Sequence, residues 1–170
     1  MDIFTSLAIT IICPAITMAL LLAPGLRVVP AYQRLVVFRL GRIIGQKGPG
    51  IVILIPILDR AVKVELREQE QQFQSGALNT KDDTNVIVDL ILRYKVVDPL
   101  KSVIVVADLR VSLREAVTQI LKDLMSTWDY SDTLFKRSQL GDDIRTRLQR
   151  TVQDWGIEVS SLELREISKN

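Results

Sequence analysis

The sequence contains no histidine and only one cysteine, Cys13, among its 170 residues. Histidine is the commonest general base and metal ligand near neutral pH, so its absence removes the usual centre of acid–base and metal chemistry. One cysteine cannot form an intrachain disulfide or a cysteine-based zinc cluster. The glycines at positions 45, 48 and 50 fit neither phosphate-binding glycine pattern, and no G-x-S-x-G motif is present. These absences argue against an enzyme, and we assign no catalytic, cofactor-binding or metal-binding residues.

Aromatic residues are also scarce, at 5% of the chain, and they do not alternate with basic residues in any stretch. Proteins that bind single-stranded nucleic acids combine aromatic and basic residues, and a net charge of +2 is too small to indicate nucleic-acid binding by itself. The adjacent carboxylates Asp82 and Asp83 are better explained as turn residues than as a metal site. We therefore expect no nucleic-acid partner and no bound metal.

Charged residues are missing between Asp2 and Arg27, which leaves 24 uncharged residues at positions 3–26. About 20 apolar residues cross a bilayer as a helix, so residues 1–26 are predicted to be a membrane anchor. Met1 and Asp2 do not form the basic start of a cleaved signal peptide, which favours a retained anchor. The anchor residues that we single out are Ile3, Leu7, Ile12, Pro14, Leu20 and Leu26.

Pro14 lies in the middle of this segment, where proline kinks a helix. Two geometries remain open, a single kinked span and a re-entrant hairpin that returns to the side from which it came. Cys13 is most simply a small apolar residue of the anchor, and lipidation of its thiol is the alternative.

The stretch after the anchor, residues 27–58, has five basic residues and no acidic one. Positive charge beside a membrane segment favours the cytoplasmic side, so we expect the folded part to lie on that side of a cell or inner membrane. The same side chains could contact anionic headgroups or face water. These juxtamembrane residues are Arg27, Arg34, Arg39, Arg42 and Lys47.

Hydrophobic patterns predict several strands after the anchor. Residues 35–40 form the first, residues 45–50 read as a Gly- and Pro-rich loop, and residues 61–67 alternate. The apolar run at 51–58 is predicted to be a buried strand, with shallow membrane contact as the alternative. Residues 86–96 have the clearest strand pattern, because every even-numbered position is apolar or aromatic.

Helix signals follow these strands. Asp98 is predicted to cap a helix that opens with Pro99. Ser112 and Glu115 match a capping box, S-x-x-E, which predicts the start of a second helix.

A third helix is predicted from near Ser138 to Gly156, a glycine suited to a helix C-terminus. Residues 157–167 then form a final strand, whose alternation slips between Val159 and Leu162 and so suggests a bulge. Trp155 is either a core residue or a wedge at a subunit interface. The order of strands, helices and strand predicts an α+β domain with a mainly antiparallel sheet and packed helices.

Five short segments stand out: residues 32–42 (YQRLVVFRLGR), 47–50 (KGPG), 80–82 (TKD), 94–99 (YKVVDP), and 155–159 (WGIEV) with 162–164 (LEL). Together they resemble the SPFH (Band 7) domain of the stomatin–prohibitin family, and stomatin-like proteins most of all. None is specific alone, but all five occur in the family's order, and the resemblance covers residues 28–167. It implies an SPFH domain at residues 27–170, preceded by the N-terminal membrane segment.

The resemblance implies proteins that oligomerise on membranes and organise lipids and membrane proteins into microdomains. We therefore predict a membrane-anchored, homo-oligomeric scaffold that has no catalytic activity and no cofactor. The alternative is a dedicated regulatory subunit of a membrane protease or an ion channel. Members of the family usually continue into a long, charged coiled coil, and we expect none within residues 27–170, which weakens the expectation of large rings.

The anchor can be tested with the double substitution Ile12→Asp and Leu20→Asp. A charged residue near the bilayer centre costs roughly 2.5–3.5 kcal/mol on insertion scales, so we expect the variant to leave the membrane fraction. Flotation of the full chain with vesicles measures the change. Unaltered flotation of the double variant would contradict the assignment of an anchor.

Overall fold

The computed structural model describes residues 25–169, which fall into two compact units that divide after Glu65. Most of the predicted anchor, including Ile3, Leu7, Ile12, Pro14 and Leu20, lies outside the described residues. Between residues 25 and 169, no helix has the length and apolar character needed to cross a membrane.

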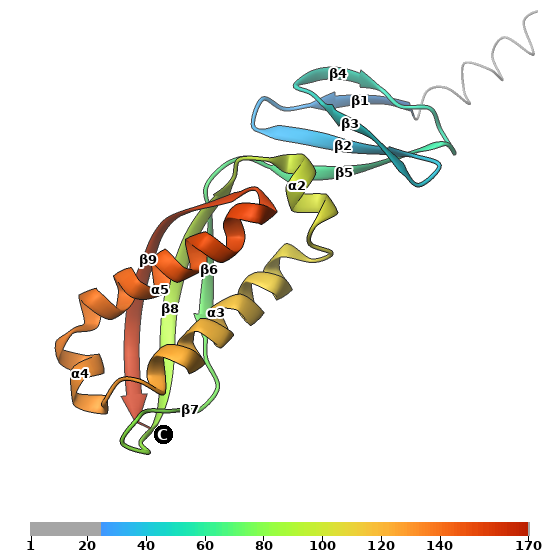
Figure 1. Ribbon diagram of the computed structural model, residues 1–170. Helices are drawn as coiled ribbons and strands as arrows, with labels where there is room; N and C mark the ends of the chain where they lie inside the picture. Colours follow the sequence, from blue (N-terminus) through green and yellow to red (C-terminus); the bar gives the residue numbers. More distant parts are fainter. Residues whose placement is uncertain (1–24, 170) are drawn as a thin grey trace, which may run out of the picture. The chain divides into compact units, whose positions relative to one another are not determined.

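The N-terminal unit consists of two small antiparallel sheets that lie one over the other (Figure 1). In one sheet β1 (Leu26–Val29) pairs with β4 (Gly50–Ile53). In the other, β2 (Gln33–Arg39) lies between β3 (Arg42–Lys47) and β5 (Asp59–Glu65). Alternate residues of these strands point between the two sheets and form a small core of Val29, Leu35, Val37, Val52 and Leu54, with Ala61 against it.

The predicted loop at residues 45–50 is wrong in its first half, because β3 continues to Lys47. Val37 pairs with Gly45 and Phe38 with Ile43, so one residue of β3 bulges out of the ladder. Gly45 has a φ of 139°, a conformation that glycine adopts easily. Gly45, which the sequence suggested was a loop residue, therefore adopts the backbone conformation of a β-bulge inside a strand.

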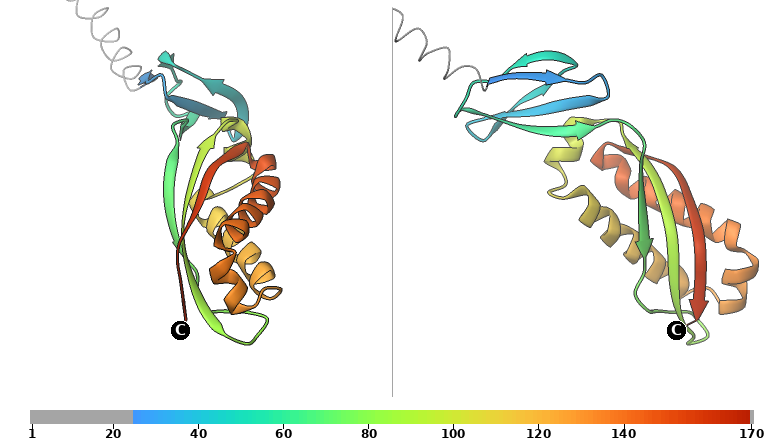
Figure 2. Two further views of the ribbon diagram at one scale, coloured as in Figure 1. Left: turned by 90° about the vertical axis from the view of Figure 1, so that its left-hand side faces the viewer. Right: turned by 180° about the vertical axis from the view of Figure 1, so that it is seen from behind.

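The C-terminal unit is built around one long strand, β8 (Asn85–Val96). This strand pairs antiparallel with β6 (Gln69–Gln74), β7 (Leu78–Asn79) and β9 (Ile157–Lys169), which confirms the predicted antiparallel sheet. Helices lie on one face of this sheet only (Figure 2). They are α2 (Pro99–Ile104), α3 (Leu109–Met125), α4 (Tyr130–Phe135) and α5 (Arg137–Val152), followed by the short η2 (Gln153–Trp155).

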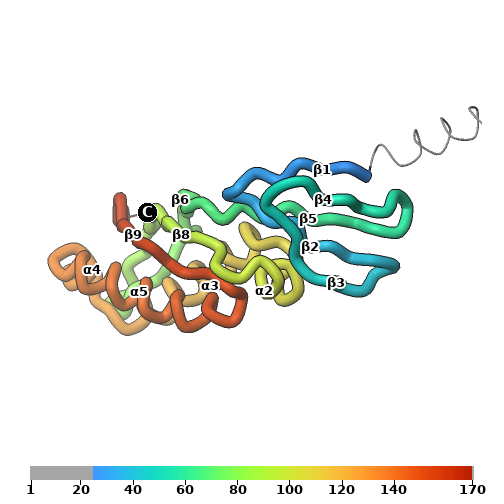
Figure 3. Tube along the Cα trace, turned by 90° about the horizontal axis from the view of Figure 1, so that it is seen from above, coloured from blue at the N-terminus to red at the C-terminus, as the bar shows by residue number. Residues whose placement is uncertain are grey.

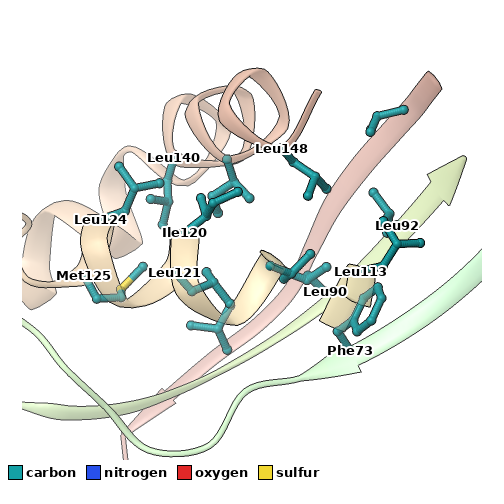
Figure 4. Packing of buried hydrophobic residues seen from close by; sticks show 14 of the residues in the cluster. Phe73, Leu90, Leu92, Leu113, Ile120, Leu121, Leu124, Met125, Leu140 and Leu148 are labelled. Atoms are coloured by element: carbon teal, nitrogen blue, oxygen red, sulfur yellow. The ribbon is translucent and has the colours of Figure 1, made fainter. Parts of the chain in front are cut away.

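The two faces of β8 differ as its alternation predicts. The helix-facing residues are buried against α3 and α5, in a core that includes Leu113, Leu121, Leu140 and Leu148 (Figure 4). They are Val86, Val88, Leu90, Leu92, Tyr94 and Val96. On the other face, ion pairs join the strands, and Arg93 bridges Glu70 of β6 at 2.9 Å and Glu163 of β9 at 3.0 Å.

Two of the predicted helix ends are confirmed. The carboxylate of Asp98 accepts hydrogen bonds from the backbone N–H groups of Leu100 and Lys101, at 3.1 and 3.2 Å. Gly156 has a φ of 71°, in the left-handed region that glycine favours. A Cβ atom at this position would lie 2.6 Å from the backbone oxygen of Asp98, so space as well as conformation requires glycine here.

The predicted capping box is wrong, because α3 begins one turn earlier. Asp108 caps this helix by accepting from the backbone N–H groups of Arg110 and Val111. Helix α4 was not predicted, since six residues without a side-chain cap of their own carry little signal. Its first N–H, from Tyr130, donates instead to the carboxylate of Asp82, 48 residues away in the turn before β8, at 3.2 Å.

The bulge predicted in β9 is confirmed at Ser160, and a second one occurs at Arg165. Helix α5 also bonds to the backbone of this strand. The carboxamide of Gln149 accepts from the N–H of Val159 at 2.7 Å and donates to the carbonyl of Ile157 at 3.3 Å. The guanidinium of Arg137 donates to the carbonyl of Leu164. Side chains of α5 thus occupy backbone groups that a further strand would otherwise pair with.

The substitution Gln149→Ala tests this contact. It leaves buried backbone groups of Ile157 and Val159 without partners, so we expect the free energy of unfolding to fall by about 1–3 kcal/mol. Gln139→Ala is a matched control, because Gln139 is an exposed residue of the same helix and its loss should change stability by no more than about 0.5 kcal/mol. Equal urea midpoints for the two variants would show that the Gln149 bonds contribute nothing.

Candidate membrane-contact surface

The pair of strands β1 and β4 carries apolar residues on both of its faces. Val29, Val52 and Leu54 point into the core. On the opposite face Leu26 pairs with Ile53, and Val28 pairs with Ile51. These four side chains are 57–76% exposed, and we call them the outer apolar face. A sheet with one face in water normally carries polar residues on that face, so this surface is unusual for one that stays in water.

A second group of exposed apolar side chains lies at one end of the unit, where the loop between β4 and β5 meets the turn between β2 and β3 (Figure 3). The N–H of Leu40 in the turn donates to the carbonyl of Leu58 in the loop at 3.1 Å, which ties the two segments together. Ile57 is 99% exposed and Leu40 is 76% exposed. We call this group, Leu40, Ile55, Ile57 and Leu58, the apolar tip.

The backbone at the tip adopts conformations that bulky residues avoid. Ile57 has a φ of 74° and Leu40 a φ of 49°, both in the left-handed region. Such conformations cost about 1–3 kcal/mol each and tend to occur at functional sites. Ile57 combines a β-branched side chain, a strained backbone and full exposure, so folding of the unit alone does not explain it.

The carboxylate of Asp59 holds the tip in this conformation. It accepts from the backbone N–H of Ile55 at 2.8 Å and from the guanidinium of Arg39 at 2.7 and 3.0 Å. The side chain of Asp59 has no exposed area. The hydrogen bond from Arg39, with a smaller contribution from the Ile55 N–H, lowers the pKa of Asp59 from 3.8 to about 2. The group is therefore charged at physiological pH.

Gly25, at the C-terminal end of the predicted anchor, lies beside the tip. The carbonyl of Gly25 accepts from the N–H of Leu54 at 2.8 Å, immediately before Ile55. A Cβ atom on Gly25 would lie 2.2 Å from the Leu54 oxygen, so only glycine permits this approach. The segment predicted to be an anchor therefore joins the unit at the end that carries the apolar tip.

The N-terminal unit carries most of the positive charge. Residues 25–65 contain seven basic and two acidic residues, a net charge of +5, whereas residues 66–170 contain 15 basic and 17 acidic residues, a net charge of −2. Of the five predicted juxtamembrane residues, Arg27, Arg42 and Lys47 are exposed. Arg34 donates to the carbonyls of Ala31 and Gln33, and Arg39 is paired with Asp59.

The prediction of a buried strand at residues 51–58 is wrong. β4 ends at Ile53, and within the run only Val52 and Leu54 are buried. The remaining isoleucine and leucine side chains of the run are exposed, and the alternative, shallow membrane contact, stays a prediction. The other predicted site residue, Trp155, is partly buried and packs against the core of the C-terminal unit, and its role at a subunit interface stays a prediction. Among residues 25–169, no cluster of three or more His, Cys, Asp or Glu side chains is placed to hold a metal ion.

Comparison with known proteins assigns the chain to a family. The model of the SPFH domain/Band 7 family matches residues 27–170, so the chain belongs to this family. It is 34% identical over 143 residues to Stomatin-1 of Caenorhabditis elegans, covering 84% of this chain and 43% of the relative. It is 31% identical over 146 residues to a stomatin homolog of Pyrococcus horikoshii, covering 86% and 55%. It is also 30% identical over 140 residues to Stomatin-like protein 1 of Mus musculus, covering 82% and 35%.

These comparisons confirm the resemblance inferred from the five short segments. The chain spans between 35% and 55% of the length of the three relatives. The relatives are named as stomatins and stomatin-like proteins, and the family is not known for enzymes.

The substitution Asp59→Asn tests how the tip is held. Because the pKa of Asp59 is lowered to about 2, its charged form adds stability that is fully present above pH 3.8 and is lost as the pH falls toward 2. We expect the variant to lose this part of the acid dependence and to exchange the Ile55 amide proton faster at neutral pH. Urea unfolding from neutral pH to about pH 2 and hydrogen exchange measure the two effects.

Asp154→Asn is the control, since Asp154 is an exposed carboxylate in η2 of the other unit. It should leave exchange at Ile55 unchanged. If the Ile55 amide exchanged equally fast in the wild type and in Asp59→Asn, Asp59 would not be what orders the tip.

Proposed function

We propose that this protein is a membrane-associated, homo-oligomeric scaffold whose N-terminal unit touches the bilayer with its apolar tip and outer apolar face. The observation that carries the proposal is the position of the tip. Four exposed apolar side chains, one of them 99% exposed, lie where the uncharged segment of residues 3–26 joins the unit. A retained anchor would hold this end of the unit near lipid.

The energetics of the surface favour lipid over water. Burying a fully exposed Ile or Leu side chain contributes about 1.5–3 kcal/mol, and the tip and outer apolar face together offer eight aliphatic side chains. The charge of +5 on residues 25–65 adds attraction to anionic headgroups, worth about 1 kcal/mol for each basic residue near the surface. Both contributions act on the same unit, which makes it the part of the chain best suited to lie on a bilayer.

Family membership supports the scaffold role and the assembly of several copies, because the SPFH resemblance implies proteins that oligomerise on membranes. The basic residues after the anchor favour the cytoplasmic side for both units. Lipids are the primary partners in this proposal, and organising membrane proteins is its consequence. A dedicated regulatory subunit of a membrane protease or an ion channel is the alternative, and it would co-purify with one partner protein in fixed proportion.

Fluorescence quenching by lipids tests the contact. In a Cys13→Ser background, single cysteines replace Ile53, Ile57 or Gln46, and each carries the same fluorophore in full-length protein reconstituted in phosphatidylcholine vesicles. Gln46 is the control, because it is exposed and pairs with Val36, away from the outer apolar face. We expect lipids brominated on the acyl chain to quench the labels at positions 53 and 57 and to spare the label at 46.

Equal quenching at all three positions, or none at any, would refute the proposed contact even if the anchor held the protein in the vesicle.

Light scattering of the same protein in detergent tests assembly. We expect a mass several times that of one chain, and a monomer would remove the oligomeric part of the proposal.

A further inference from the structure

A pocket of about 430 Å³ lies beside the apolar tip, within the N-terminal unit. Its volume falls in the range of about 300–1,000 Å³ that is usual for small-molecule sites. Three residues of the tip, Leu40, Ile57 and Leu58, form part of its wall. The remaining lining residues are Phe38, Gly41, Asp59, Arg60 and Val62.

The apolar part of the pocket comes from one face of the β2–β5 pair. Phe38 lies directly opposite Arg60, and Val36 lies opposite Val62. Opposite residues of an antiparallel pair have their side chains on the same face, about 4.5–5.5 Å apart at Cβ. Phe38, Arg60 and Val62 therefore share one face, where an aromatic ring and an aliphatic side chain stand next to a guanidinium group.

The pocket has one charge that is not neutralised. Two of its lining residues are charged, and the carboxylate of Asp59 is already paired with Arg39 at 2.7 Å. Arg60 is exposed, and among the described residues no carboxylate lies within ion-pair distance of it. The pocket therefore combines an apolar wall with a single available cation at its edge.

We propose that this pocket binds one anionic phospholipid of the bilayer, with part of an acyl chain against Phe38 and Val62 and the phosphate at Arg60. The inference rests on the proposed function, because the tip must reach lipid before the pocket can take a lipid molecule. Leu40, Ile57 and Leu58 belong both to the apolar tip and to the pocket, so apolar side chains connect the proposed membrane contact to the pocket.

Other occupants match the pocket less well. A free phosphate ion would use Arg60 but leave the apolar lining in water. A sterol or a zwitterionic lipid could fill the cavity but would bring no net negative charge to Arg60. An anionic lipid satisfies both halves of the site, and it would hold the N-terminal unit on lipids of one charge class rather than on any bilayer.

Photocrosslinking in vesicles tests the proposal. Full-length protein is reconstituted in phosphatidylcholine vesicles that contain a small fraction of a probe, either phosphatidylglycerol or phosphatidylcholine, with a diazirine on the acyl chain. The readout is labelling at Phe38 and Val62, which are partly buried, relative to labelling at Ile57, which is fully exposed. We expect the phosphatidylglycerol probe to label the two pocket residues more strongly than the phosphatidylcholine probe does.

Arg60→Gln should lower the phosphatidylglycerol labelling of the pocket about fivefold, the change that about 1 kcal/mol for one basic residue corresponds to. Arg42→Gln is the matched control, because Arg42 is an exposed cation of the same unit that does not line the pocket. Leu58→Trp narrows the pocket from its rim and should lower labelling by both probes.

Equal labelling by the two probes, or equal losses in Arg60→Gln and Arg42→Gln, would overturn the lipid site. The proposed function would survive that result if the labels at positions 53 and 57 were still quenched by brominated lipid. Absence of both quenching and crosslinking would reject the membrane contact and the lipid site together.

Discussion

The structure of the N-terminal unit depends on a strand whose two faces are both apolar. In β4 and the residue that follows it, Val52 and Leu54 fill the core, while Ile51 and Ile53 point the opposite way and stay exposed. A strand of this composition is most stable when both of its faces contact apolar groups. The second sheet of the unit supplies one side, and in our proposal lipid supplies the other.

One buried carboxylate explains how the adjoining tip keeps its shape. A loop that carries Ile55, Ile57 and Leu58 would gain by folding these side chains inward, away from water. Asp59 opposes this by holding the Ile55 N–H and the Arg39 guanidinium at the base of the loop. Since Asp59 stays charged until the pH falls to about 2, the restraint acts throughout the physiological range. Arg39 thus serves to position the tip, whereas Arg60 is the cation of the proposed lipid site.

The C-terminal unit is stabilised differently. It has a large core on one face of its sheet and ion pairs on the other. Arg93 and Lys95 of β8 pair with carboxylates of the neighbouring strands, so the open face is polar and its charges are matched. Gln149 and Arg137 occupy backbone groups of β9, which lowers the tendency of that strand to pair with another chain. The C-terminal unit is therefore stabilised by its own core, by matched charges on the open face and by side-chain contacts along its edge strand.

The sequence by itself determined the features that depend on local pattern. The alternation of β8, the Asp98 cap and the left-handed Gly156 were all predictable, because each follows from neighbours a few residues apart. The family was also predictable, since short segments in a fixed order identify it. Tertiary structure decided the rest. In a continuous apolar run the sequence does not show which residues will be covered by a second sheet. The exposure of Ile51, Ile53 and Ile57 therefore follows only from the tertiary structure. Likewise, Asp82 could be recognised as the cap of α4 only once folding had brought together residues 48 positions apart.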